Sequence, residues 1–214
     1  NTHNPGKEEK SSMENTNEML TASARALVTE IESVVIGKHN EIVLLVTALL
    51  SGGHVLIEDV PGTGKTTLAA ALAKAAGLKF NRAQFTPDVM ASDITGFNVY
   101  NRQTESFSFT EGLVMTNILL ADEINRASPK TQSALLEAME EAKVTVDGVT
   151  YPVPEPFFVI ATQNPTGSAG TTLLPSSQLD RFLIRLSMGY PDHRSQINIL
   201  RDRHSENPLD RVQP

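Results

Sequence analysis

The run Glu-Asp-Val-Pro-Gly-Thr-Gly-Lys-Thr-Thr at residues 58–67 constrains this chain more than any other feature. It follows a short apolar run at 55–57 and leads into a helix-forming run at 67–73. A strand, a glycine-rich loop and a helix in this order are the setting of a phosphate-binding loop, in which backbone N–H groups face an anion. Gly62 and Gly64 leave room for those N–H groups to turn inward. The loop therefore predicts a nucleotide site in an α/β fold.

The loop core supplies a phosphate ligand and a metal ligand. We expect the Lys65 ammonium to bind the β- and γ-phosphates of ATP and the Thr66 hydroxyl to bind Mg²⁺. Asp59 stands where the pattern G-x-x-x-x-G-K-[ST] usually has its first glycine. The alternative is an ordinary Gly-Pro turn before a helix, which the flanking strand and helix disfavour. The residues expected to contact the nucleotide are Pro61, Gly62, Thr63, Gly64, Lys65, Thr66 and Thr67.

Composition excludes several classes of protein. The 214 residues, 40% of them hydrophobic, suffice for one large domain. The chain has no cysteine, so disulfides and thiolate metal sites are excluded, and its five histidines show no metal-ligand spacing. The sequence contains no run of 18 apolar residues, so no membrane span is predicted. The polar N-terminus shows no signal peptide, and we therefore expect a cytoplasmic protein. The net charge of −7 argues against nucleic acid as the main partner.

Apolar runs that alternate with helical patterns predict the fold class. Ser128 and Pro129 suit the N-cap and first position of a helix over 128–142. We expect an open five-stranded parallel α/β sheet flanked by helices. Residues 1–17 are expected to be a disordered or expression-derived tail, 18–190 the core and 191–214 a further segment. The expected strands are 55–57, 78–85, 117–121, 157–161 and 182–186, and the other expected helices are 18–35 and 40–50.

Two insertions have the pattern of β-hairpins. Residues 97–100 and 106–109 alternate in polarity around a polar turn. Residues 144–152 form a stronger case, because Asp147-Gly148 fits a tight type I′ turn.

Acidic and amide side chains follow two of the apolar strands. Asp122 and Glu123 come directly after the run that ends at Ala121, and Asn164 follows the run around Ile160. Because ligands collect at the carboxyl ends of parallel strands, we expect Asp122 to face Mg²⁺ and Glu123 to polarise a water molecule that attacks the γ-phosphate. Asn164 is expected to hold that water or the γ-phosphate. The alternative interpretations are a solvated acidic turn and an Asn-Pro turn.

Together these residues resemble the AAA+ ATPases, in particular the MoxR group. The stretches ILLADEINRASPKTQSALLEAMEE (118–141) and EDVPGTGKT (58–66) are very similar to signature stretches of that group. Supporting matches are Val35-Ile36-Gly37, QFTPD (84–88), VIATQNP (159–165) and QLDR (178–181). The resemblance covers residues 20–214 and implies the P-loop NTPase fold, with Asp59 as a habit of the group.

The resemblance also assigns roles to single residues. Lys65 and Thr66 would be the Walker A residues, Asp122 and Glu123 the Walker B pair, and Asn164 the sensor 1 residue. In addition, Ile36 and Gly37 would lie near the adenine. The family pattern continues with a helical lid, of which 191–214 would be only the start.

An arginine would complete the site from a neighbouring subunit. Arg181 resembles the arginine finger, whose guanidinium stabilises charge on the γ-phosphate in the transition state. The alternative is a surface salt bridge with Asp180. Arg126 and Arg185 are weaker candidates for contacts between subunits.

The resemblance implies that identical subunits assemble into a ring, a hexamer. Such a ring would remodel or mature partner proteins, among them von Willebrand factor A domain proteins. A chelatase-like or helicase-like motor shares both hairpins, but a helicase would carry a basic hairpin tip where this chain has Asp147-Gly148. A nucleotide-dependent binding switch would lack Glu123 or Arg181, and both are present.

Overall fold

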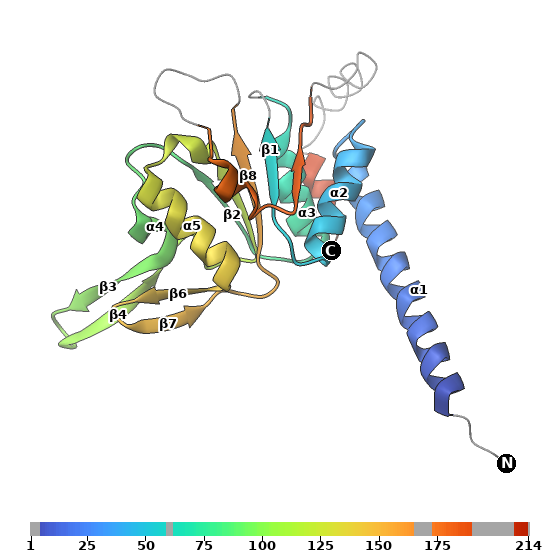
Figure 1. Cartoon of the computed structure of the whole chain (residues 1–214), viewed down its shortest axis with the longest axis horizontal. Helices are drawn as coiled ribbons and strands as arrows, with labels where there is room; N and C mark the ends of the chain where they lie inside the picture. Colours follow the sequence, from blue (N-terminus) through green and yellow to red (C-terminus); the bar gives the residue numbers. More distant parts are fainter. Residues whose placement is uncertain (1–4, 59–61, 165–172, 190–207, 214) are drawn as a thin grey trace.

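Five short strands form one parallel sheet in the order β2-β5-β8-β1-β9 (Figure 1). The computed structural model describes residues 5–58, 62–164, 173–189 and 208–213, and side chains in these ranges from residue 18 onward. All neighbouring strands pair in parallel, so the predicted five-stranded parallel sheet is confirmed. The strands are β1 Val55–Glu58, β2 Phe80–Gln84, β5 Ile118–Asp122, β8 Phe158–Gln163 and β9 Ile184–Leu186.

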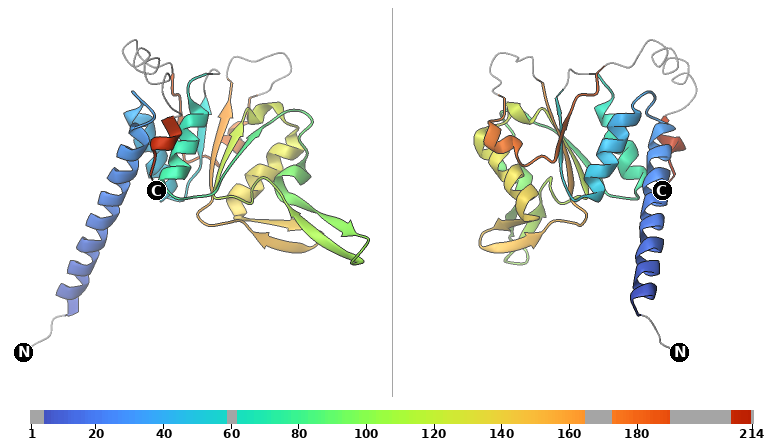
Figure 2. Two further views of the ribbon diagram at one scale, coloured as in Figure 1. Left: turned by 180° about the vertical axis from the view of Figure 1, so that it is seen from behind. Right: turned by 45° about the vertical axis from the view of Figure 1, so that its right-hand side comes forward.

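The sheet is the middle of three layers. Leu120 and Ile160 face the apolar core under α1, α2 and α3, while their neighbours Leu119 and Val159 face the core under α5. This alternation explains the unbroken apolar runs, because both faces of the central strands are covered. Figures 1 and 2 show the helical layers on the two faces. The helices are α1 Pro5–Glu32, α2 His39–Leu50, α3 Lys65–Ala75, α4 Ala91–Thr95 and α5 Pro129–Glu141.

Three shorter segments complete the described fold: the 3₁₀ turns η1 Ile124–Arg126 and η2 Pro208–Arg211, and the helix α6 Ser176–Leu179. At the start of α5, the Ser128 hydroxyl accepts a hydrogen bond from the Thr131 N–H at 3.2 Å, and Pro129 takes the first helical position. The predicted cap of this helix is therefore confirmed.

The two predicted hairpins are present and lie side by side (Figure 1). They consist of β3 Gly96–Asn101 with β4 Ser106–Glu111, and of β6 Lys143–Val146 with β7 Val149–Pro152. Asp147 and Gly148 have φ angles of 49° and 81°, as the type I′ turn requires. The Asn98 amide donates to the Asp147 carboxylate at 2.8 Å, and the Phe109 ring stacks on Tyr151 at 3.9 Å. The two insertions therefore form one unit.

The first helix differs from its prediction. We expected a disordered tail to residue 17 and a helix over 18–35, whereas α1 begins at Pro5 and ends at Glu32. Proline suits a first helical position, and residues 7–17 contain neither proline nor glycine but several strong helix formers. The polarity of this segment predicted disorder, although polarity alone does not prevent helix formation. Figure 1 shows the beginning of α1 projecting away from the sheet.

The C-terminal residues 208–213 return to the helical layer of α1 and α3. Val212 is 1% exposed, the Lys74 ammonium donates to the Leu209 carbonyl at 2.7 Å, and the Gln213 N–H donates to Glu30 at 2.6 Å. The lid helix expected after residue 191 falls within 190–207, outside the described residues, so it stays a prediction. No helix in the described ranges is long and apolar enough to cross a membrane.

Candidate nucleotide-binding site

The carboxyl ends of β1, β5 and β8 meet at one edge of the sheet and border a cavity of about 220 Å³. This is the place where open parallel sheets bind ligands. Five residues from three separate motifs come together here, so they form one site as predicted: Lys65, Thr66, Asp122, Glu123 and Asn164. The other described residues that line the cavity are Gly62, Thr63, Gly64, Arg82, Gln84 and Thr162.

The loop after β1 has the backbone geometry that an anion needs. Gly62 and Gly64 have φ angles of 88° and 86°, in the left-handed region that strains any residue with a Cβ. Gly64 directly precedes α3, so the first N–H groups of this helix lie at the cavity. The Thr63 hydroxyl is buried and has no hydrogen-bond partner in the described part of the chain. Leaving such a donor unpaired costs about 1–3 kcal/mol, which an acceptor such as phosphate would relieve.

The Thr162 hydroxyl holds both acidic residues in position. It donates to Asp122 Oδ1 at 2.8 Å and accepts from the Glu123 N–H at 2.9 Å. Asp122 is 8% exposed, and its second oxygen, Oδ2, accepts from Nη2 and Nε of Arg82 at 2.8 and 3.3 Å. The Asp122 carboxylate is therefore oriented by donors from the two neighbouring strands.

Glu123 adopts a strained backbone next to this carboxylate. Its φ and ψ angles are 55° and 49°, which is rare for a residue other than glycine and costs of order 1–3 kcal/mol. Strain of this kind gathers at functional sites, and here it turns the chain sharply from β5 into η1. The Glu123 carboxylate accepts from Arg126 at 2.9 Å. Arg126, a weaker candidate for a contact between subunits, thus pairs within its own chain.

A second polar network joins the ends of three neighbouring strands. Glu58 accepts from Gln163 at 2.5 Å and from Arg185 at 2.8 Å. Burial acts to raise the pKa of Glu58, but the hydrogen bonds from Arg185 and Gln163 and the charge of Arg185 outweigh it, so the pKa lies below its usual value. Glu58 is therefore anionic at neutral pH. Glu58 is the last residue of β1 and Gln163 the last residue of β8, so this network ties together the ends of these two strands.

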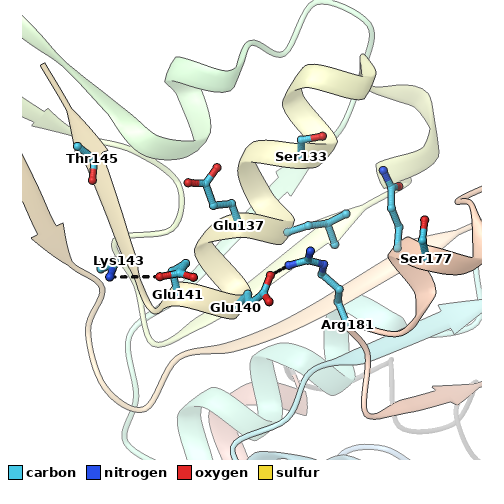
Figure 3. A pocket seen from close by; sticks show the side chains of 10 residues that line it. Ser133, Glu137, Glu140, Glu141, Lys143, Thr145, Ser177 and Arg181 are labelled. Carbon is cyan, nitrogen blue, oxygen red and sulfur yellow. Dashed lines mark ion pairs between the residues drawn. The ribbon is translucent and has the colours of Figure 1, made fainter. Parts of the chain in front are cut away.

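Arg181 lies away from this cavity, on the side of the sheet covered by α5. It follows α6 and forms an ion pair with Glu140 of α5, as Figure 3 shows. Glu140 rather than Asp180 is its partner, so the salt bridge that we considered at Asp180 is replaced by one with another residue. The two residues border a second cavity of about 450 Å³, whose wall also carries Glu137 and Glu141. Within one chain, Arg181 is not among the described residues that line the nucleotide cavity.

The remaining predicted nucleotide contacts stay predictions. Pro61 lies outside the described residues, and Ile36, Gly37 and Thr67 are not among the described residues that line the cavity. Gly37 has a φ angle of 75° and ends the turn that follows α1, and the ammonium of the next residue, Lys38, donates to the carbonyl groups of Met188 and Gly189 beyond β9. This turn is thus tied to the strand next to β1.

The residues at the cavity fit Mg²⁺ that arrives with a nucleotide. In the described ranges, no three His, Cys, Asp or Glu side chains gather into a metal site of their own. Thr66 and Asp122 both line the cavity and carry the hard oxygen atoms that would hold this ion. Mg²⁺ is commonly held by one or two protein oxygens plus phosphate oxygens and water, so this sparse ligand set suits a nucleotide-borne ion.

Comparison with known proteins identifies the family. Residues 54–184 match the ATPase family associated with various cellular activities (AAA). The chain belongs to the AAA family of ATPases. Within this family the MoxR resemblance is confirmed, because Chaperone MoxR1 of Mycobacterium tuberculosis is 44% identical over 173 residues, which cover 81% of this chain and 46% of that protein.

Two further comparisons cover most of this chain. The protein YeaC of Bacillus subtilis is 53% identical over 187 residues, covering 87% of this chain and 58% of YeaC. The crystal structure of a candidate ATPase from Cytophaga hutchinsonii superposes with a TM-score of 0.86 at 40% identity, covering 96% of this chain and 62% of that one. This chain thus spans about half the length of the curated relatives that it matches.

Sequence reasoning missed three residues of the AAA site. Arg82 and Thr162 contact Asp122, and Glu58 ties the start of the phosphate loop to β8 and β9. Glu58 and Thr162 lie within the stretches 58–66 and 159–165 that we singled out, but neither was assigned a role there, and Arg82 lies in none of these stretches. Arg82 reaches Asp122 because β2 pairs with β5 in a register that places Arg82 beside Leu120 and Gln84 beside Asp122, and the strand patterns do not predict this register.

Proposed function

We propose that this chain is the nucleotide-binding core of a MoxR-type ring ATPase that hydrolyses ATP with Mg²⁺ and uses the cycle to remodel or mature partner proteins. The observation that carries the proposal is the meeting of Lys65, Thr66, Asp122, Glu123 and Asn164 at one cavity. The protein is expected in the cytoplasm, as a hexamer, with partners that include von Willebrand factor A domain proteins.

The arrangement supports a division of labour among these residues. Lys65 and the N–H groups at the start of α3 would bind the phosphates, and Thr66 with Asp122 would hold Mg²⁺. Bound Mg²⁺ would neutralise charge that develops on the β- and γ-phosphates. Glu123 is the carboxylate available to accept a proton from the attacking water, and Asn164 would orient that water. In this assignment Arg126 pairs with Oε2 of Glu123, and Oε1 is the oxygen that would accept the proton.

The substitution Glu123→Gln tests the hydrolytic role. The amide keeps the size of the side chain but cannot accept the proton, so the full-length protein should bind ATP with affinity near that of the wild type. Its turnover should fall by about 10²–10⁴-fold. Nucleotide binding is measured by equilibrium fluorescence and turnover by phosphate release.

Glu18→Gln is the matched control, because Glu18 is an exposed glutamate on α1 far along the chain from the site. Unchanged turnover in Glu123→Gln would remove Glu123 from the mechanism. A wild-type protein that binds ATP without hydrolysing it would favour a nucleotide-dependent binding switch. The helicase-like alternative gains no support from the hairpin tip, where Asp147 places a carboxylate instead of a cation.

A further inference from the structure

Arg82 is a cation of the nucleotide cavity to which no motif assigns a role. Arg82 and Gln84 line the cavity, while Ala83 between them is buried in the core under α5, as the alternation of a strand requires. Together with Lys65, Arg82 is one of two cationic side chains among the described residues of the cavity wall. Its side chain is 47% exposed, whereas the side chain of its partner Asp122 is 11% exposed. The guanidinium therefore has room to move, and the carboxylate does not.

The present partner of Arg82 conflicts with the proposed role of Asp122. Both carboxylate oxygens already accept hydrogen bonds from the protein, Oδ1 from Thr162 and Oδ2 from Arg82. A divalent cation held at Oδ2, directly or through its water ligands, would lie beside the guanidinium, and like charges at such separations repel. Mg²⁺ and the guanidinium therefore compete for the same oxygen of Asp122.

A bound nucleotide brings an alternative anion into the same cavity. Arginine forms two parallel charge-assisted hydrogen bonds with phosphate oxygens, a geometry that lysine cannot reproduce. If Mg²⁺ bridges the β- and γ-phosphates at Asp122, the terminal phosphate lies on the Asp122 side of the cavity, where the guanidinium already is. Exchange of partners then removes the repulsion and neutralises the phosphate.

We propose that Arg82 leaves Asp122 for the terminal phosphate of Mg·ATP and so acts as a cis residue that distinguishes ATP from ADP. This inference rests on the proposed function and deepens it. With ADP bound, the cavity holds no γ-phosphate, so the guanidinium gains no new phosphate partner and adds little to the affinity for this nucleotide. The partner of Arg82 would therefore change with the bound nucleotide, at β2, one of the two edge strands of the sheet.

The test compares the affinities of full-length wild type and Arg82→Gln for a fluorescent non-hydrolysable ATP analogue and for the matching ADP analogue, both with Mg²⁺. Glutamine keeps an N–H donor for Asp122 but removes the charge. The affinity for the ATP analogue should fall about tenfold while that for ADP changes less than about twofold, a difference of about 1.4 kcal/mol. Arg102→Ala, an exposed arginine in the turn of the first hairpin, should change neither affinity.

A residue that merely holds Asp122 in place would give a different result. Both affinities would then stay unchanged or fall by the same factor, and either outcome overturns the proposal. If Arg82→Gln does not fold, Arg82→Lys decides, because its ammonium keeps Asp122 paired but cannot bind phosphate in two parallel bonds. Its ATP-to-ADP affinity ratio should fall by at least about threefold, and an unchanged ratio overturns the proposal. A wild type that binds neither analogue would refute the proposed function itself.

Discussion

At the scale of single residues, His54 shows how the core fixes a protonation state next to the sheet. Its ring is 6% exposed, Nδ1 accepts from the Val159 N–H at 3.1 Å, and Nε2 lies 3.1 Å from the Met139 carbonyl, to which it donates. Nδ1 can accept only in the neutral ring. Burial lowers the pKa of His54, and the hydrogen bond to Met139 offsets this only in part. In the folded state His54 is therefore neutral, and its two hydrogen bonds link β8 to α5.

This pKa shift predicts that acid destabilises the fold. The folded pKa lies below the value of 6.5 in the unfolded chain, so the unfolded state binds more protons once the pH falls below 6.5. The stabilisation is complete above pH 6.5 and is lost as the pH falls below it, by at most about 1.4 kcal/mol per pH unit. His54→Gln keeps a donor and an acceptor but does not titrate, so its free energy of unfolding should fall less between about pH 7.5 and pH 5.5. Urea unfolding of the wild type and the variant at several pH values measures the free energy of unfolding. An equal decrease in both proteins would contradict the prediction.

Single residues also show where sequence reasoning succeeds. Lys65, Thr66, Asp122, Glu123 and Asn164 were predicted to meet because each belongs to a motif that follows a strand, and parallel strands end at one edge. The contacts that orient these residues were not predictable in the same way. They come from side chains such as those of Arg82 and Thr162, whose partners are set by strand order and rotamer rather than by spacing along the chain.

At the scale of elements, the two hairpins join into one insertion unit. Sequence patterns predicted each hairpin because alternation and turn residues are local properties. Their association was not predicted, since it depends on the Phe109–Tyr151 stack and the Asn98–Asp147 hydrogen bond between segments far apart in the chain. The unit exposes aromatic side chains, with Tyr100 and Phe107 at 49% and 70% exposure. A unit of this kind would move as one body against whatever it contacts.

The stack should therefore couple the two hairpins energetically. In a double-mutant cycle, Phe109→Ala and Tyr151→Ala should show an interaction energy of about 0.5–1.5 kcal/mol, because the rings stack at an interplanar angle of 7°. Phe107→Ala with Tyr151→Ala is the control cycle, since Phe107 contacts Tyr100 instead. The control should be additive within about 0.5 kcal/mol. Urea unfolding supplies all the free energies, and additivity in the first cycle would mean that this stack does not couple the hairpins.

At the scale of the whole molecule, the nucleotide cavity of one chain is lined by the groups that we propose for phosphate binding and water activation, and Arg181 is not among its described lining residues. Arg181 is held by Glu140 at the α5 side, beside a wall that also carries Glu137 and Glu141 (Figure 3). An exposed ion pair of this kind contributes only about 0–1 kcal/mol, so a contact with a stronger anion can replace it. In a ring with head-to-tail interfaces, one face of a subunit meets the opposite face of its neighbour. We predict that in such a ring Arg181 contacts the γ-phosphate bound by the neighbouring subunit.

Mixing two inactive variants of the full-length protein tests this prediction. Lys65→Ala subunits should lack their own phosphate site but supply Arg181, and Arg181→Ala subunits should do the reverse. Each variant alone should be inactive. In rings assembled from equal amounts, about one quarter of the interfaces combine an intact Lys65 with an intact Arg181, so about that fraction of wild-type turnover should return. Phosphate release from mixtures at several ratios measures it. Because a cis arginine would leave every site in the mixture with one defect, no recovery at any ratio would mean that Arg181 serves its own chain or none.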